Sequence, residues 1–488
     1  MSIWQDLSSR WKNSIVHLFI TKNCYDPDKP FLCPTEKKTN ATGFIIDAAK
    51  GLVMTNDHVV QNATSVIGRL FLTGQQNFGL RVYSVCPPKD LALCQFTPEA
   101  MKDLKRNVGD SLDFLTMKFS SDFFPVYSEE VMTLGFPLNE DEIKFTLGTI
   151  SGFNIRNACL ESKFVEDACS RSPIYLQTTA PLNPGNSGGP VLNSIGEVIG
   201  VANSGIVGSQ SVGYMINARV AQAVLGELYK GKFVCIPTLG LGLTKATNLL
   251  LKTLTGTDQV EGLFIRECFP DSCLKLVECG DILSEIEYSV DSELIKGTLD
   301  KFGDVLMYKN DELVSDRRLA LSEFVDFIPI GTRIRTVLYR DKERLEIESN
   351  YVWVPSNRII PMYPRLHFND YKSNLTRKSC AHVQYLIFCG MCLMELACEH
   401  LPDAKRIYDD CIIVTHVFPE TLADQMGFFG KHCKIIKING MEVRKLEDVR
   451  GIGKGNVTIE TDEGDVFMIT GEQKRVEDER ILKFYELG

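Results

Sequence analysis

Residues from about 10 to 225 form a series of short apolar and β-branched runs separated by Gly, Asn and Pro. Examples are Ser14–Ile20, Thr42–Asp47 and Gly196–Ala202, each of which has the length of a strand. Little of this region shows the 3.6-residue apolar period that an amphipathic helix needs. The pattern therefore favours an all-β barrel or sandwich over the first half of the chain.

A helical pattern replaces the strand pattern at residue 218. Four apolar residues recur there at helical spacing, namely Val220, Val224, Leu225 and Leu228. The predicted helix runs to Lys230 and stops at Gly231, because glycine readily adopts the backbone conformation that ends a helix. We therefore place the first domain boundary at residue 232.

With 488 residues, the chain is long enough for about three domains. Two weaker repeats follow the first domain, and each opens on an apolar segment that contains glycine. The predicted organisation is a first domain at 1–232, a second at 233–350, a linker at 351–379, a third at 380–472 and a C-terminal tail at 473–488.

The net charge of −10 argues against a general nucleic-acid-binding protein, which needs clustered Lys and Arg for its phosphate contacts. The segment Met1–Leu7 lacks the basic and apolar regions of a secretory signal, and no apolar stretch of 18 residues follows. We therefore expect a soluble protein of the cytoplasm or nucleus without membrane insertion. In such a compartment Asn40-Ala41-Thr42, which matches the glycosylation pattern, stays unmodified.

The 16 cysteines are expected to remain reduced thiols in such a compartment. In an oxidising setting, two short loops, Cys24 to Cys33 and Cys159 to Cys169, could close a disulfide. Four further side chains are of zinc-ligand type: Cys389, Cys392, Cys398 and His400. They lack a second matched ligand pair, and half of them lie in an apolar run, so we expect buried thiols and no metal or cofactor.

Three polar residues of the first domain have the types and the order of a nucleophilic triad. His58 lies in Val53–Val60, where a strand of small apolar residues runs into a turn. Asp90 begins another apolar strand, and Ser187 lies in the glycine-rich segment Asn183–Pro190. A serine hydroxyl needs a base to remove its proton and a carboxylate to orient that base. The order His, Asp, Ser is that of the chymotrypsin-like fold.

The glycines beside Ser187 predict an oxyanion hole. Two backbone N–H groups must converge on one point, and Gly185 allows the backbone angles that this requires. We assign the hole to the amides of Gly185 and Ser187, with Asn186 as an additional candidate. His17, the other histidine of the first domain, lies within an alternating strand and is expected to be structural.

The segments Thr55–Val60, Asp90–Leu93 and Asn183–Pro190 resemble those of the HtrA/Deg family of trypsin-like serine proteases. One protease domain followed by two PDZ-like repeats fits the same family, and Gln384–Leu396 is similar to the opening of the second PDZ domain in plant-type Deg proteases. The resemblance implies a mainly β fold, with a chymotrypsin-like double β-barrel followed by two PDZ-like α+β domains. It also implies a trimer-based homo-oligomer that cleaves unfolded or damaged proteins without ATP.

The specificity pocket is predicted to be apolar. Thr178–Leu182 contains no acidic residue that could pair with a cationic substrate side chain. The predicted lining consists of Leu182, Asn203, Ser204, Gly205 and Tyr214. We therefore expect cleavage after small or aliphatic residues. Asp57 departs from the small residues usual in the family at this position, and either raises the pKa of the neighbouring imidazole or points to solvent.

The backbone N–H groups of Gly240, Leu241, Gly242 and Leu243 are predicted to bind a peptide carboxylate, with the strand edge extended by the peptide. For Gly390–Leu393 the same role and a purely structural one are equally supported. Two other functions for the whole chain stay open. One is a PDZ-based scaffold or chaperone with an idle triad, and the other is a selective processing protease with one substrate.

Overall fold

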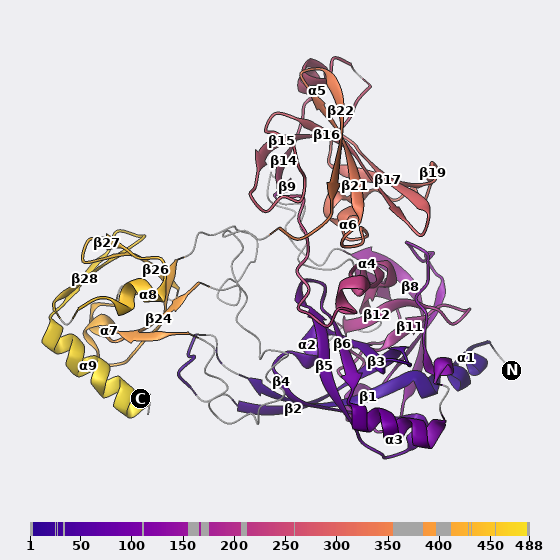
Figure 1. The fold of residues 1–488 in the computed structure, drawn as a ribbon, viewed down its shortest axis with the longest axis horizontal. Coiled ribbons are helices and arrows are strands. Elements are labelled where there is room, and N and C mark those ends of the chain that lie inside the picture. Colours follow the sequence, from indigo (N-terminus) through magenta and orange to yellow (C-terminus); the bar gives the residue numbers. More distant parts are fainter. Residues whose placement is uncertain are drawn as a thin grey trace. The chain divides into compact units, whose positions relative to one another are not determined.

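The fold is given by a computed structural model (Figure 1). It describes residues 3–485 apart from 25, 27, 33–34, 110–111, 155–164, 167–174, 206–211, 258, 355–383, 397–410, 428, 431 and 454. The chain divides into two compact units, residues 1–21 with 38–354 and residues 22–37 with 355–488. The first unit contains two barrels and a third sheet, and the second contains a fourth sheet.

The first barrel closes through six strands. Their order is β1 (Ile15–Cys24), β2 (Thr35–Asp47), β3 (Leu52–Thr55), β6 (Leu91–Phe96), β5 (Phe78–Cys86) and β4 (Ala63–Leu70). Strand β5 shows why this sequence forms a barrel wall, because buried Phe78, Leu80 and Val82 alternate with exposed Gly79 and Arg81. Helix α3 (Pro98–Val108) follows β6 and is capped by Thr97, whose hydroxyl accepts the amide of Ala100 at 3.2 Å.

The second barrel also closes through six strands. Their order is β10 (Tyr175–Thr178), β13 (Gly213–Asn217), β12 (Val198–Gly205), β11 (Pro190–Leu192), β7 (Glu130–Gly135) and β8 (Lys144–Asn154). The two closed barrels confirm the predicted double-barrel fold.

Helix α4 (Ala218–Leu228) follows the second barrel and matches the helix predicted from residue 218. Asn217 caps it by accepting the amide of Arg219 at 2.7 Å, and Val220, Val224 and Leu228 form its buried face. The helix ends two residues before the predicted Lys230, and Gly231 takes φ +68° just beyond it.

The third sheet has ten strands. Along its main path the order is β19 (Glu312–Leu313), β18 (Asp304–Lys309), β17 (Glu293–Leu299), β16 (Ile282–Val290), β15 (Leu263–Cys268), β14 (Leu241–Lys245) and β9 (Val165–Glu166). Strand β21 (Arg333–Arg340) also pairs with β16 and carries β22 (Glu343–Asn350), while β20 (Leu319–Ala320) pairs with β18. Helices α5 (Asn248–Thr255) and α6 (Leu321–Val325) belong to this part of the chain.

The fourth sheet has seven strands. Their order is β23 (Leu386–Phe388), β24 (Met391–Glu395), β25 (Ile412–Val417), β26 (Cys433–Ile438), β28 (Val457–Thr461) and β29 (Val466–Ile469), with β27 (Met441–Glu442) on β26. Three helices accompany it, α7 (Leu422–Met426), α8 (Leu446–Arg450) and α9 (Gly471–Phe484). Sheets with short helices fit the predicted α+β PDZ-like domains, whose boundaries stay predictions.

The predictions for the linker, the C-terminal tail and the disulfides involve residues that the structure describes only in part. Of the linker expected at 351–379, the structure describes 351–354. Residues 473–484 of the expected C-terminal tail lie in α9, which Thr470 caps by accepting the amide of Gln473 at 3.3 Å. Cys24 is a free thiol, and the other cysteines of the two predicted loop disulfides lie outside the described residues. Within the described ranges, no helix is long and apolar enough to cross a membrane.

The segment between β1 and β2 belongs to the second unit. Phe31 packs against Phe418 and Tyr485, with ring centroids 4.8 and 4.9 Å apart. Asp28 pairs with His432, whose Nε2 lies 2.6 Å from its carboxylate. The segment between β1 and β2 is therefore part of the core of the second unit, which contains the fourth sheet.

His17 is a buried structural residue, as its place in a strand suggested. It is 2% exposed and stacks on Phe136, with ring centroids 4.1 Å apart and planes 6° from parallel. Within the described residues its Nε2 has no hydrogen-bond partner. Burial lowers the pKa of His17 to about 4, so the ring is neutral near pH 7.

We predict that His17→Phe makes the fold less sensitive to acid. The unfolded chain takes up a proton on His17 near its ordinary pKa of 6.5, whereas the folded chain resists until about 4. This contribution to the free energy of unfolding is complete above pH 6.5 and is lost as the pH falls towards 4, by ~2 kcal/mol at pH 5. Urea midpoints at pH 7 and pH 5, in a Ser187→Ala background, measure it. An equal loss at pH 5 with and without His17 would contradict the assignment.

Candidate active site

Sheet pairing brings His58 and Asp90 together. His58 lies in the short helix α2 (Asp57–Val60) just beyond β3, and Asp90 lies just before β6. Strands β3 and β6 are antiparallel partners with Thr55 opposite Ala92, so the two residues leave the same end of the sheet. Asp90 has a left-handed backbone with φ +50°, a conformation that Asp tolerates better than most residues.

The Asp90 carboxylate holds His58 through two contacts. Its Oδ1 accepts the backbone amide of His58 at 2.8 Å, and its Oδ2 lies 2.7 Å from His58 Nδ1. An ionised carboxylate can only accept, so Nδ1 carries the hydrogen and Nε2 keeps a lone pair. The imidazole is therefore fixed in the tautomer that a general base needs.

Asn203 joins this cluster. Its Nδ2 donates to Asp90 Oδ2, and its backbone oxygen accepts the hydroxyl of Ser187 at 2.8 Å. The Asn203 side chain thus turns towards the carboxylate that contacts His58, and its place in the specificity pocket stays a prediction. Ser204 and Gly205 continue β12 opposite Tyr214 and Gly213.

Thr42 ties the serine turn to the first barrel. It is fully buried at the centre of β2, and its amide donates to Ser187 O at 3.0 Å. Its hydroxyl donates to Gly185 O at 2.7 Å and accepts the amide of Phe136 at 3.0 Å. The Thr42 carbonyl in turn accepts the hydroxyl of Thr55 at 2.9 Å. One side chain thus links β2, the end of β7 and the loop that bears Ser187.

The serine turn leaves two amides open. Asn186 donates to Asn183 O at 3.0 Å, Gly188 to Ala202 O at 2.8 Å and Gly189 to Asn186 O at 3.0 Å. In the part of the chain that the structure describes, no backbone acceptor is found for the amides of Gly185 and Ser187. The Asn186 amide thus has an acceptor within the turn, and a role for Asn186 at the oxyanion hole stays a prediction.

Gly185 is required where it stands. Its φ is +106°, and a Cβ at this position would lie 2.2 Å from the carbonyl oxygen of Phe136. The amide of Leu138, which follows β7, donates to the carbonyl oxygen of Pro184 at 2.7 Å. This bond also holds the loop that contains Gly185. The backbone conformation of the turn therefore excludes any side chain at 185.

Leu182 and Tyr214, which are predicted to line the specificity pocket, lie in apolar surroundings. Both are 8% exposed, and Leu182 packs among Ile150, Leu176 and Met215 of the second barrel. The ring of Tyr214 lies 6.2 Å from that of Tyr175 between centroids. These neighbours offer no negative charge to a substrate side chain.

Asp57 does not point to solvent. It is 3% exposed, which excludes one of the two alternatives for this residue. The preceding Asn56 donates from Nδ2 to the carbonyl oxygen of Asp90 at 3.0 Å. The turn from β3 into α2 is therefore packed against the Asp90 loop.

The Asp90 loop is also anchored to the α6 region. Lys89 is 1% exposed and forms an ion pair with the buried Asp326, which follows α6. Burial raises the pKa of Asp326 to about 6, and the Lys89 ammonium opposes this rise. Removing one partner would leave an unpaired buried charge, which costs about 3–5 kcal/mol in comparable cases.

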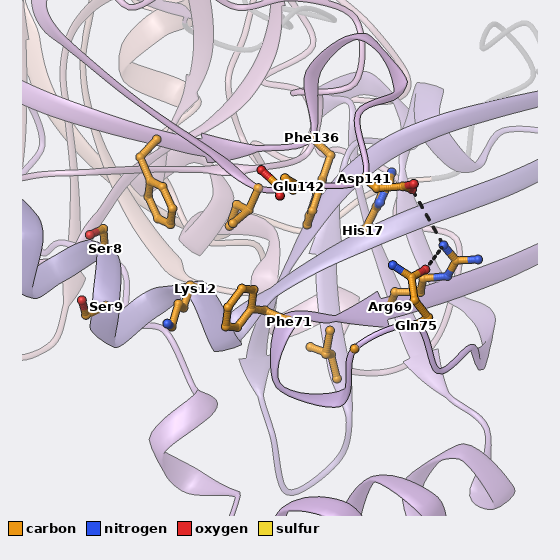
Figure 2. A pocket seen from close by; sticks show the side chains of 14 residues that line it. Ser8, Ser9, Lys12, His17, Arg69, Phe71, Gln75, Phe136, Asp141 and Glu142 are labelled. Atoms are coloured by element: carbon orange, nitrogen blue, oxygen red, sulfur yellow. Dashed lines mark hydrogen bonds and ion pairs between the residues drawn. The ribbon is translucent and has the colours of Figure 1, made fainter.

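A cavity of about 560 Å³ shares one residue, Phe136, with the surroundings of the serine turn. Figure 2 shows Phe136 and His17 at its wall, with Arg69 reaching Asp141 at 3.9 Å and Gln75 at 2.9 Å. Phe136 is shared by both places, because its carbonyl faces Gly185 while its ring lines the cavity.

The predicted peptide site of the third sheet is partly used by the chain itself. The amide of Gly240 donates to the hydroxyl of Thr238 at 2.9 Å. Strand β14 pairs with β15 on one side and with β9 on the other, where Gly242 faces Glu166 and Leu243 faces Val165. The strand edge expected to accept a peptide is therefore covered at these two residues.

The zinc interpretation receives no support from the described residues. Cys389 and Cys392 are fully buried, and burial raises the pKa of the Cys392 thiol to about 12. Within the described ranges, no group of three potential ligands could hold a metal ion, while Cys398 and His400 lie outside them.

Sequence reasoning missed Thr42 and the hydrogen bond from Asn203 to Asp90. Thr42 was visible only as the end of a glycosylation match, and no local pattern marks a threonine that bonds to a segment 143 residues away. Asn203 lies in the right strand for the pocket, but the direction of its side chain depends on a register shift in β12 between Ala202 and Ser204.

Comparison with known proteins bears on the first unit above all. The family of the trypsin-like peptidase domain matches residues 41–201. The putative serine protease HhoA of Synechocystis is 27% identical over 304 residues, which cover 59% of this chain and 71% of that protein. The periplasmic serine endoprotease DegP of Escherichia coli is 26% identical over 311 residues, or 63% of this chain and 55% of DegP. This chain thus spans little more than half of DegP.

A plant relative matches over a longer range. The putative mitochondrial protease Do-like 3 of Arabidopsis thaliana is 24% identical over 459 residues, which cover 89% of this chain and 71% of that protein. The match therefore extends beyond the two barrels into both of the following sheets.

We predict that Thr42→Val disables the site while Thr42→Ser preserves it. Valine keeps the shape but leaves the Phe136 amide and the Gly185 carbonyl without their partner, at a cost of ~1–3 kcal/mol for buried groups. Because the turn that holds the two open amides loosens, kcat/KM should fall by about tenfold to hundredfold. Hydrolysis of labelled casein and the urea midpoint of both variants measure the effect. Equal activity of the Val and Ser variants would contradict the role of the hydroxyl.

Proposed function

We propose that this chain, which carries a trypsin-like peptidase domain homologous to the HtrA/Deg serine proteases, is a serine endopeptidase in which Ser187, His58 and Asp90 hydrolyse peptide bonds through an acyl-enzyme. The observation that carries the proposal is the contact network around Asp90, which fixes the His58 tautomer and reaches Ser187 through Asn203. No metal or cofactor is needed for this chemistry.

The residues act in a defined order. The Ser187 hydroxyl, which donates to Asn203 O in this structure, gives its proton to His58 Nε2 as Oγ attacks the carbonyl carbon. His58 then protonates the leaving amine, and the Asp90 carboxylate stabilises the imidazolium in between. A water molecule activated by the same imidazole resolves the acyl-enzyme and restores Ser187.

The oxyanion is proposed to sit against the amides of Gly185 and Ser187. Both belong to a turn whose other amides have backbone acceptors, which supports a donor pair reserved for a ligand. Donors held in place before reaction need no reorganisation, and loss of one such donor typically costs 10²- to 10³-fold in rate.

Cleavage after small or aliphatic residues is proposed from the buried, apolar setting of Leu182 and Tyr214. A cationic side chain in this region would lose its water without gaining a carboxylate. The preference therefore follows from desolvation as much as from size.

The natural substrates are proposed to be unfolded or damaged proteins, and the active form a trimer-based homo-oligomer without nucleic-acid partners. The basis is the family resemblance of the whole chain. The cytoplasmic or nuclear location stays a prediction, since relatives are named as mitochondrial, chloroplastic and periplasmic proteins.

A scaffold function with an idle triad is not favoured. Such a function needs open peptide grooves, whereas the β14 edge is covered by β9 at Gly242 and Leu243. A selective processing protease would use the same catalytic residues and differs only in the range of its substrates.

We predict that Ser187→Ala abolishes hydrolysis of labelled casein and labelling by a fluorophosphonate. Asp90→Asn should retain about one part in 10⁴ of the activity, because the amide favours the wrong His58 tautomer. Ser65→Ala, at an exposed position of β4, is the matched control and should behave as the wild type. Undiminished casein hydrolysis by Ser187→Ala would overturn the assignment of the nucleophile.

We predict that a peptide library shows turnover after Ala, Val or Ile at least about tenfold above that after Lys or Arg. Leu182→Ala should shift the preference towards larger residues such as Leu and Phe, because it empties space in the pocket region. Preferred cleavage after basic residues would contradict the apolar pocket while leaving the triad assignment intact.

A further inference from the structure

The two glycine-containing loops of the third and fourth sheets are structural equivalents. The carbonyl of Gly240 accepts the amide of Phe269 at 2.8 Å, and the carbonyl of Gly390 accepts the amide of Phe418 at 3.0 Å. Both glycines have positive φ, +61° and +75°. The amides around Gly390 therefore occupy the place at which the first repeat was predicted to hold a carboxylate.

These amides already bind a carboxylate in the structure. The amide of Cys389 donates to Asp478 Oδ2 at 3.2 Å, and the amide of Gly390 donates to Asp478 Oδ1 at 3.0 Å. Each carboxylate oxygen thus accepts one backbone N–H, an arrangement suited to a carboxylate end group. Asp478 is 9% exposed, so its two oxygens are held away from bulk water.

Helix α9 presents Asp478 from the C-terminal part of the chain and is held by further contacts. Glu477 Oε1 accepts the amide of Leu422 at the start of α7, at 3.1 Å. Lys474 lies 3.7 Å from Asp478 and 4.7 Å from the ring centroid of Phe388. Ile481 is buried in the cluster that contains Ile387 and Phe418. The helix is therefore a packed element, and Asp478 is its point of contact with the loop.

Burial of Asp478 has a cost that these contacts offset. Desolvation raises the pKa of this carboxyl, while the amides of Gly390 and Cys389 and the Lys474 ammonium act in the opposite direction. A buried carboxylate is retained where backbone donors satisfy it, and an unsatisfied one would be strongly unfavourable.

The strand edge beside the loop is also filled from within the chain. Strand β24 pairs with β25 on one side and with β23 on the other, with Leu386 opposite Leu393 and Phe388 opposite Met391. An extended peptide adds to a sheet through a free edge, and β24 has none over these residues.

We propose that the Cys389 and Gly390 amides form a carboxylate-binding site whose ligand is Asp478 of the chain's own C-terminal helix. The second repeat thus binds α9 at this site. A peptide with a free carboxyl terminus can bind there only when α9 has dissociated from the loop. Under this proposal Gly390–Leu393 bind a carboxylate of the chain itself, which combines the two alternatives weighed for this loop.

Chemical rescue tests the site in the full-length Ser187→Ala chain, which avoids self-digestion. Asp478→Ala removes the carboxylate and leaves space for a small anion, so hydrogen exchange at the Cys389 and Gly390 amides should rise by about tenfold or more. Sodium formate at 100 mM should restore most of the protection, whereas sodium chloride at the same concentration should not. Glu479→Ala, at an exposed neighbouring position that pairs with Arg475, is the matched control and should show neither effect.

Asp478→Asn is the control that separates loss of the carboxylate from loss of the fold as the cause of faster exchange. It fills the same space with a neutral amide, so it should exchange faster than wild type at these two amides and should not respond to formate. Protection in Asp478→Ala equal to wild type, or a formate effect no larger than that of chloride, would overturn the proposal. General exposure of the fourth sheet in Asp478→Ala that formate does not reverse would likewise show a structural contact without a carboxylate site.

Discussion

The hydrogen bonds of Thr42 are the interaction on which the geometry of the proposed active site depends. Its hydroxyl bridges Gly185 O and the Phe136 amide, and its own amide holds Ser187 O. The serine turn belongs to the second barrel, while Thr42 belongs to the first, so these hydrogen bonds join the turn that bears Ser187 to the barrel that bears His58. A single buried threonine can do this because it offers a donor and an acceptor on one side chain, in addition to its backbone groups.

Asp90 is the second organising centre, and its surroundings come from three distant segments. His58 arrives through the pairing of β3 with β6, Asn203 through β12, and Lys89 anchors the loop by its pair with Asp326. The buried pair links the loop that bears the carboxylate of the proposed triad to the region after α6. A displacement of that region would therefore shift Asp90, the residue that contacts His58.

The repeats of the third and fourth sheets have an equivalent glycine-containing loop, but the amides of the loop donate to different acceptors. In the first, the Gly240 amide bonds to Thr238 and β9 covers the strand edge. In the second, Asp478 takes the two amides and β23 takes the edge. Unpaired strand edges and open N–H groups invite unwanted association, and both repeats satisfy theirs from within the chain. The loops and strand edges that would bind a peptide thus bond to other segments of the same chain.

The sequence by itself indicated a β-rich first domain, the resemblance to the HtrA/Deg family, which implied the double barrel, and the three residues of the proposed triad. Strand-length apolar runs and the segments around His58, Asp90 and Ser187 are local signals, and each can be read within about ten residues. The tertiary structure decided the partners that complete the site. It turned Asn203 towards Asp90, placed Thr42 under the serine turn and brought Asp478 to a loop 88 residues earlier in the chain. Such contacts depend on strand register and on where a helix docks, and no local pattern encodes either, because both arise only when separate segments pack together.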